Sequence, residues 1–215
     1  MSLFTIISLM SEGMYRTVGI FVLTLLFSLP LGLIVCFGRM SKNFIIRTIT
    51  KIYISILRGT PLMLQLMVVY FGPYYLFKMS IGEWRYPAII VAFAINYAAY
   101  FAEIYRSGIE AIPKGQYEAA GLLGYNKIQT FVKIILPQVV KIILPSVTNE
   151  VITLVKDTSL AYTLSYLEIF ALAKQIAAAQ TTMVPFVVAG VFYYIFNLLV
   201  SVTMEQFEKK INYFK

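Results

Sequence analysis

The sequence predicts an all-α integral membrane protein with five transmembrane helices. Of its 215 residues, 60% are hydrophobic and only 13% are charged, and the mean hydropathy is +0.78. Soluble domains carry about 25% charged residues, so this composition excludes a soluble domain, and it excludes disorder for the same reason. Long uncharged runs of the length that a bilayer requires, about 20 residues, recur along the chain.

Charged residues mark the ends of most of these runs. The five predicted spans cover residues 17–38, 59–77, 86–102, 138–156 and 183–206. The fourth is the least obvious, because Lys141 and Glu150 interrupt it. Pro137 suits the first turn of that helix, and Pro145 predicts a kink within it. Residues 2–10 are too short to span and lack the basic start of a signal peptide, so they predict an interfacial helix.

The distribution of charge predicts the orientation. The net charge of +8 is taken as a topology signal, because 13 of the 18 Lys and Arg residues fall on one side of the predicted spans. Basic residues of short loops stay in the cytoplasm, which places the N-terminus outside and the C-terminus inside. An odd number of spans without a visible repeat is untypical of a secondary transporter and favours one half of a dimer.

Several kinds of chemistry are excluded. The chain has no His and a single Cys, Cys36, so it has no Ser-His-Asp or Cys-His site and no His/Cys metal site. It also lacks G-x-x-x-x-G-K-[ST], the phosphate-binding loop of ATPases. We therefore expect a single membrane domain over residues 1–215 that is not an enzyme and binds no cofactor of its own.

The longest polar segment lies between the third and fourth predicted spans, at residues 103–137. Its apolar residues recur at helical spacing, and Pro113, Gly115 and Gly124 divide it into short helices. One interpretation is a simple connector. Connectors are usually short, however, and exposed apolar residues favour a docking surface in the cytoplasm.

This loop contains a family motif. Glu118-Ala119-Ala120, Gly124 and the sequence Ile134-x-Leu136-Pro137 match the EAA loop of ABC importer permeases at each defining position. Residues 102–116 resemble the polar amino acid permeases, the histidine, glutamine and arginine permease family. Two further stretches, 58–62 and 156–160, resemble other signatures of that family. The resemblance covers about residues 12–210.

The resemblance implies a type I ABC importer permease fold in the bacterial cell (inner or plasma) membrane. It also implies the partners: a second permease, taken as an identical copy, two ABC ATPase subunits that bind ATP and Mg, and an extracytoplasmic solute-binding protein. The ATPase-coupling residues would be Glu118, Ala119, Ala120, Leu122, Gly124 and Tyr125. No nucleic acid partner is expected.

The residue types of the loop fit this role. Glu118 is expected near the start of a short helix, where the positive end of the dipole favours a carboxylate. The two alanines would allow close approach to a partner, Gly124 would supply a turn, and Leu122 and Tyr125 would be buried anchors. The local alternative is that Glu118 caps its own loop and Gly124 only ends a helix.

A polar stripe marks the fourth span. Ser146, Glu150, Thr153 and Asp157 follow spacings of 4, 3 and 4, which place them on one helix face. Glu150 lies roughly 13 Å past Lys141, near the middle of the bilayer. A charge there costs about 2.5–3.5 kcal/mol unless it faces protein or water. The stripe therefore predicts the lining of a pathway, with an interhelical hydrogen-bond network as the alternative.

Other polar residues complete the candidate site. The predicted substrate-binding residues are Glu150, Asn96, Thr153, Asp157, Tyr100, Gln65, Thr158 and Ser159. Two carboxylates, Glu150 and Asp157, suggest a cationic solute, because a guanidinium or ammonium would compensate their desolvation. Asn96, Thr158 and Ser159 are candidate donors to the substrate carboxylate. Lys156 lies beside Asp157, which keeps a neutral solute open.

The expected function is therefore the alternating-access permease of an importer for polar, basic amino acids (arginine, lysine or histidine), driven by a separate ATPase. Glutamine or another polar amino acid is the alternative substrate. An ATPase-independent channel or carrier is a different class, which flux through the purified chain would favour. A membrane scaffold is another, but it gives no reason for Glu150 at mid-depth.

Overall fold

The computed structural model describes residues 2–80 and 82–211, and within them the predicted all-α fold is confirmed. Lys215, one of the basic residues assigned to the cytoplasmic side, lies outside this part. The elements are α1 (Leu3–Arg39), α2 (Phe44–Gly59), α3 (Leu62–Phe77), α4 (Arg85–Glu110), α5 (Lys114–Leu122), α6 (Lys127–Thr130), the π-helix η1 (Phe131–Ile135), α7 (Leu136–Asp157), the 3-10 helix η2 (Thr158–Leu164), α8 (Ile169–Gln180) and α9 (Val184–Ile211).

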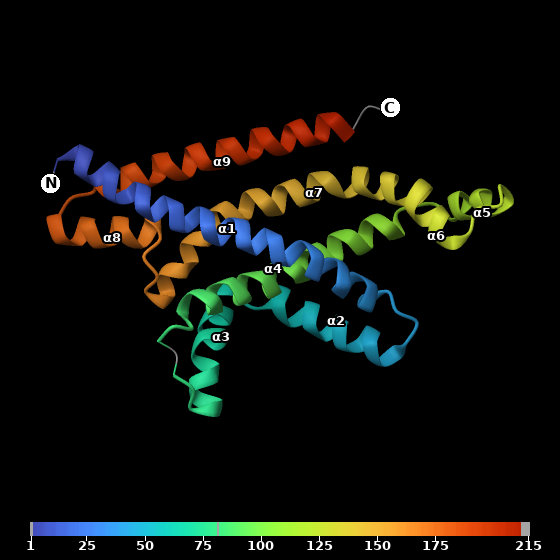
Figure 1. Ribbon diagram of the computed structural model, residues 1–215, viewed down its shortest axis with the longest axis horizontal. Coiled ribbons are helices and arrows are strands. Elements are labelled where there is room, and N and C mark those ends of the chain that lie inside the picture. Colours follow the sequence, from blue (N-terminus) through green and yellow to red (C-terminus); the bar gives the residue numbers. More distant parts are fainter. Residues whose placement is uncertain (1, 81, 212–215) are drawn as a thin grey trace.

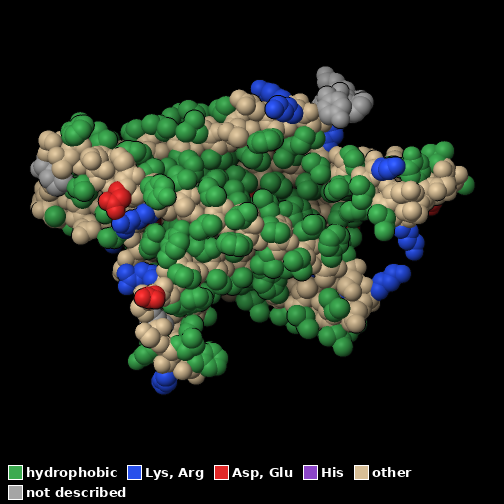
Figure 2. All heavy atoms as spheres, viewed as in Figure 1, with side chains coloured by type: hydrophobic (Ala, Val, Ile, Leu, Met, Phe, Trp, Pro, Cys, Tyr) green, Lys and Arg blue, Asp and Glu red, His purple; other side chains and the backbone are tan. Residues whose placement is uncertain are grey.

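Four of the described helical segments are long and apolar enough to cross a membrane, and α2 with α3 makes a bent fifth. The four are α1, α4, the continuous segment around α7, and α9. They run lengthwise side by side, with α8 at the end that carries the N-terminus and α5 and α6 at the opposite end (Figure 1). Hydrophobic side chains cover the middle of the visible face (Figure 2), as expected for contact with lipid.

The second span differs from the straight helix expected at residues 59–77. That run supplies only α3, which bends by 113° from α2. Thr60 is extended, with φ −124° and ψ 149°, because Pro61 disfavours the helical conformation in the residue before it. Figure 1 shows α2 beside α1 and α4, whereas the far end of α3 projects away from the bundle. Nearer the break, Leu66 and Tyr70 of α3 are buried in the main core.

The start of the chain also differs from the expectation. Residues 2–10 were expected as a separate interfacial helix, but Leu3 begins α1, which continues without a break to Arg39. Ile6 and Met10 are buried in one cluster with Ile169 of α8 and Ala189 of α9. This packing explains why the first turns stay in line with the rest of α1. Pro137 lies in the first turn of α7, as predicted.

The core of the bundle is the seam between α1 and α4. Thr24, Ser28 and Gly32 of α1 are buried at intervals of four residues, and Gly32 packs against Ala98, Phe101 and Ala102 of α4. A Cβ atom on Gly32 would lie 2.8 Å from the Cβ of Phe101 and 3.2 Å from the carbonyl oxygen of Ala98. Small residues allow membrane helices to approach this closely.

Replacing Gly32 with alanine is therefore expected to destabilise the bundle by about 1–3 kcal/mol, because α1 and α4 must separate to admit the methyl group. The measurement is thermal unfolding in detergent, where the midpoint should fall by about 2 °C or more. Gly190→Ala on α9 is the matched control, since a Cβ there meets nothing within 4 Å. Equal midpoints for the two variants would contradict the close seam.

A buried carboxylate fixes the start of α8. Glu168 is fully buried and accepts hydrogen bonds from the backbone N–H groups of Phe170 (2.8 Å) and Ala171 (2.7 Å) and from the Tyr193 hydroxyl of α9 (3.1 Å). The N–H of Ile169 donates to Thr17 of α1 at 3.3 Å. Burial raises the pKa of Glu168 to about 7, although these donors oppose the shift. The cap thereby joins α8 to both neighbouring spans.

The raised pKa of Glu168 predicts a pH dependence of stability. The folded state holds this proton more tightly than the unfolded chain, in which the pKa is near 4.5. The free energy of unfolding should therefore be highest below pH 4.5 and decrease as the pH rises to about 7. Thermal unfolding at pH 5 and pH 8 measures this. Glu168→Gln imitates the protonated acid and should flatten the profile; an unchanged slope in this variant would contradict the assignment.

Candidate functional site

A polar cavity of about 250 Å³ lies where α2, α4 and α7 meet. Its lining residues are Arg58, Tyr100, Glu103, Ile104, Arg106, Ser107 and Glu150. The Arg58 guanidinium lies 5.2 Å from the centre of the Tyr100 ring, a cation–π contact. It is also close enough to attract the half-buried Glu150 carboxylate. The cavity thus presents a cation from α2 and a carboxylate from α7 to the same small space.

An ion-pair network borders the cavity on the α4 side. Glu103 pairs with Arg106 at 2.6 Å and with Arg39, at the end of α1, at 3.8 Å. Arg106 also pairs with Glu110. These residues compensate one another's charge. In contrast, Glu150 forms no salt bridge within the described residues, and Arg58 is the cation that attracts its carboxylate.

Two predicted substrate-binding residues, Gln65 and Asn96, lie at the break between α2 and α3. The Asn96 side chain donates to Gln65 Oε1 at 2.9 Å and to the carbonyl oxygen of Leu57 at 3.1 Å. Gln65 donates to the same carbonyl at 2.9 Å and to the hydroxyl and carbonyl of Thr60. They satisfy backbone groups that the break leaves without helical partners. Their geometry is that of a structural network beside the cavity.

The remaining predicted residues near the end of α7 also lie outside the cavity lining. Asp157 accepts a hydrogen bond of 2.7 Å from the buried Tyr97 hydroxyl of α4. Thr153, Thr158 and Ser159 each donate to a backbone carbonyl three or four residues earlier. Of the eight predicted residues, the structure brings only Glu150 and Tyr100 into the cavity; substrate contact by the other six stays a prediction.

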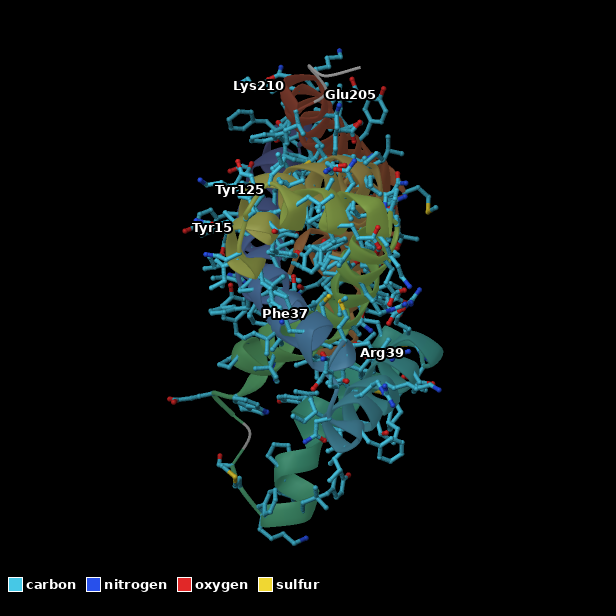
Figure 3. The ribbon with its side chains drawn as sticks, turned by 90° about the vertical axis from the view of Figure 1, so that its right-hand side faces the viewer. Tyr15, Phe37, Arg39, Tyr125, Glu205 and Lys210 are labelled. Carbon is cyan, nitrogen blue, oxygen red and sulfur yellow. The ribbon has the colours of Figure 1, made fainter. Side chains whose placement is uncertain are left out.

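The polar loop projects beyond the bundle as α5 and α6 (Figure 1), and Figure 3 looks onto this end, with Tyr125 on its outside. Gly124 ends the first of these helices with φ +81°, and the next N–H, of Tyr125, donates back to the carbonyl of Ala120 at 3.1 Å. This is the usual glycine closure of a helix. Leu122 is 91% exposed and Ile128 is 76% exposed, so the turn displays an apolar ridge.

Two expectations for the loop need correction. Glu118 does not lie in the first helical turn: α5 begins at Lys114, because Pro113 presets the backbone for a helix start, and no acidic residue occurs in its first turn. Ala120 is only 1% exposed, so it packs within the loop. Of the two alanines, only Ala119 is on the surface, and the close approach expected of both applies to it alone.

The comparison with known families agrees with this architecture. Residues 6–213 match the family described as "Binding-protein-dependent transport system inner membrane component". The chain belongs to this family.

The relatives of this permease are transport permeases of bacteria. It is 33% identical over 207 residues to the L-cystine transport system permease protein TcyB of Bacillus subtilis (strain 168), covering 95% of this chain and 87% of the relative. It is 36% identical to the putative glutamine transport system permease protein GlnP of Rickettsia bellii (strain RML369-C), covering 93% and 91%. The arginine transport system permease protein ArtQ of Bacillus subtilis (strain 168) is also 36% identical, with the same coverage.

Solved structures place the permease fold among ABC importers. An amino acid ABC transporter crystallised with histidines superposes with a TM-score of 0.86 and 31% identity, over 94% of each chain. The inward-facing MetNI methionine ABC transporter in its native crystal form superposes with a TM-score of 0.74 at 18% identity, which supports the fold alone. The permease therefore has the predicted type I importer fold and is a membrane protein.

Five of the seven cavity-lining residues of the permease were not among the predicted site residues: Glu103, Ile104, Arg106, Ser107 and Arg58. Arg58 is the one that faces Glu150 from another helix. Arg58 lies in the last turn of α2, next to the uncharged run that begins at Gly59, and the sequence pattern indicates only that it bounds a span. The available signal was that Arg58 opens one of the family-like signatures. Its position opposite Glu150 depends on the α2–α3 break, which the sequence pattern did not indicate.

Proposed function

We propose that this permease is the membrane subunit of an ATP-driven importer for polar, basic amino acids. The observation that supports it is the cavity in which the Arg58 guanidinium and the Glu150 carboxylate face the same space. An amino acid is a zwitterion: Arg58 would bind the α-carboxylate with paired N–H donors, and Glu150 would bind an ammonium or guanidinium. Because Glu150 has no salt-bridge partner within the described residues, a cationic ligand compensates its burial best.

A neutral polar amino acid such as glutamine is the second candidate. Arg58 and Glu150 together match the α-carboxylate and α-ammonium that all amino acids share. Two relatives carry names for glutamine and cystine transport, which supports this alternative. The two candidates differ in what Glu150 binds: the side chain of a basic solute or the α-ammonium of any solute.

The exposed loop supports the proposed partners. Leu122, Gly124 and Tyr125 form the surface that would dock an ABC ATPase, and that ATPase would bind ATP and Mg. A second copy would complete the path, and a solute-binding protein would deliver the amino acid from outside. The N-terminus would be outside and the loop in the cytoplasm, following the excess of basic residues on the loop side. ATP binding would close the ATPase pair and rock the two halves between inward-open and outward-open states.

Uptake by the assembled complex tests the function. The permease is purified in gentle detergent with the ATPase that accompanies it, and reconstituted with the binding protein in vesicles. We expect ATP-dependent uptake of labelled arginine that lysine inhibits more strongly than glutamine. A preference for glutamine or cystine would overturn the basic-substrate proposal. Uptake by the permease without ATPase would overturn the importer proposal and favour a channel or carrier.

A further inference from the structure

Helix α2 packs lengthwise against the two central helices. The Tyr53 hydroxyl donates to the carbonyl of Ile95 in α4, and Ile54 is buried in one cluster with Cys36 of α1. A Cβ atom added to Gly38 of α1 would lie 2.7 Å from a methyl group of Thr50 in α2. One face of α2 therefore packs against the bundle. The helix runs beside α1, from the end of the bundle that carries the polar loop (the loop-side end) towards the middle.

Two further faces of α2 are exposed, and they differ in chemistry. The first is a stripe of isoleucines at helical spacing, each more than half exposed: Ile45, Ile49, Ile52 and Ile56. This is the composition of a lipid-facing surface. The second carries Arg47, Lys51, Ser55 and Arg58, at spacings of 4, 4 and 3, and all four are exposed. We call these four residues the basic stripe.

The basic stripe runs from the loop-side end of the bundle to the polar cavity. Arg47 lies in the first turn of α2, and Arg58, in the last turn, lines the cavity and covers Tyr100. The helical rise places these two residues roughly 16 Å apart along the axis. Within the described residues, neither Arg47 nor Lys51 forms a salt bridge, so no acidic side chain of this chain compensates them.

The position of the stripe excludes contact with hydrocarbon along its length. A cation near the surface can extend to the headgroups, but one at the level of Arg58 cannot. The carbonyl just before it, of Leu57, is bound by Asn96 in the middle of α4, so the exposed end of the stripe lies level with the middle of that helix. Charged side chains at successive depths on one face require water along that face.

We propose that the basic stripe lines a water-filled exit lane from the cavity to the cytoplasm and receives the carboxylate of the departing amino acid. The proposal rests on the proposed function. Arg58 would pass the carboxylate to Lys51, roughly 10 Å further along the helix, and Lys51 to Arg47, roughly 6 Å further. Several weak sites in series let a charged solute leave a site that bound it well.

Cysteine labelling tests whether the face is in water. In a Cys36→Ala background, Ser55→Cys places a thiol on the stripe, and Ile56→Cys places one at the same depth on the isoleucine face. With a membrane-impermeant maleimide on the cytoplasmic side of the full complex, Ser55→Cys should react at least 10-fold faster than Ile56→Cys. ATP with vanadate, which holds the ATPases closed, should slow the reaction of the Ser55→Cys thiol. Equal and slow reaction of both thiols, while uptake persists, would overturn the lane.

Charge removal tests the role of the stripe in transport. Arg47→Gln with Lys51→Gln should lower the rate of ATP-driven arginine uptake about 3- to 10-fold, and Lys51→Arg should retain it. Lys42→Gln, which removes a charge from the turn before α2, is the control and should match the wild type. Unchanged uptake in the double variant would overturn the proposal, as would a defect that appears only in vesicles with anionic lipid. Absence of uptake in the wild type would instead contradict the proposed function.

Discussion

Gly124→Asp is expected to reduce ATP-driven uptake at least 10-fold, while the protein still reaches the membrane. Gly124 has φ +81° and closes α5 beside the exposed Leu122. Aspartate adds a charge at the edge of the apolar ridge that would dock the ATPase, where an unpaired charge is costly to bury. The measurement is uptake together with ATP hydrolysis in reconstituted vesicles, and hydrolysis that continues without uptake marks uncoupling.

Gly124→Asn is the matched control for this variant. Asparagine has the shape of aspartate and tolerates the left-handed conformation, but it adds no charge. It should retain more uptake than the aspartate variant, since an exposed turn can absorb the smaller change. Unchanged coupled uptake in Gly124→Asp would refute the docking role of the loop. Equal loss in both variants would attribute the defect to the backbone of the turn.

Glu150→Gln is expected to reduce arginine uptake by roughly 10- to 100-fold, the range for a lost hydrogen bond to a charged group. Glutamine uptake should fall less, because glutamine lacks the cationic side chain that Glu150 would bind. Both rates are measured in the same vesicles. Glu205→Gln removes an exposed acid near the end of α9 and is the control. Equal loss for both solutes, or no loss, would contradict a charge-selective role.

Much of the architecture was predictable because it depends on local sequence. A largely apolar run of sufficient length must be helical to satisfy its backbone in lipid. Helices α1, α4 and α7 include the runs predicted for them, and α9 begins one residue after the start of its predicted run. The glycine turn after α5 follows from one residue type, since Gly124 takes a positive φ at little cost. Helix α5 begins at Lys114, directly after Pro113, so Glu118 lies in its middle and not near its start as expected.

The roles of the polar residues were less predictable. Gln65 and Asn96 are buried polar residues of apolar helices, the pattern expected of a pathway. The structure shows that they bind each other and the open carbonyls of the α2–α3 break. The sequence contains the cause of that break, Thr60-Pro61, but its angle of 113° also depends on packing against α4. Whether a polar side chain lines a pathway or binds open backbone groups depends on the partners within its reach.

The sequence by itself determined the membrane class, the approximate positions of the spans, the long polar loop and the family, because each follows from composition, run length or a contiguous motif. Only the tertiary structure decided that Arg58 faces Glu150 and that Tyr97 binds Asp157, across 60 residues of chain. Those pairings depend on how α2, α4 and α7 cross. Helix crossing is set by the fit of side chains from distant segments, which local spacing does not specify.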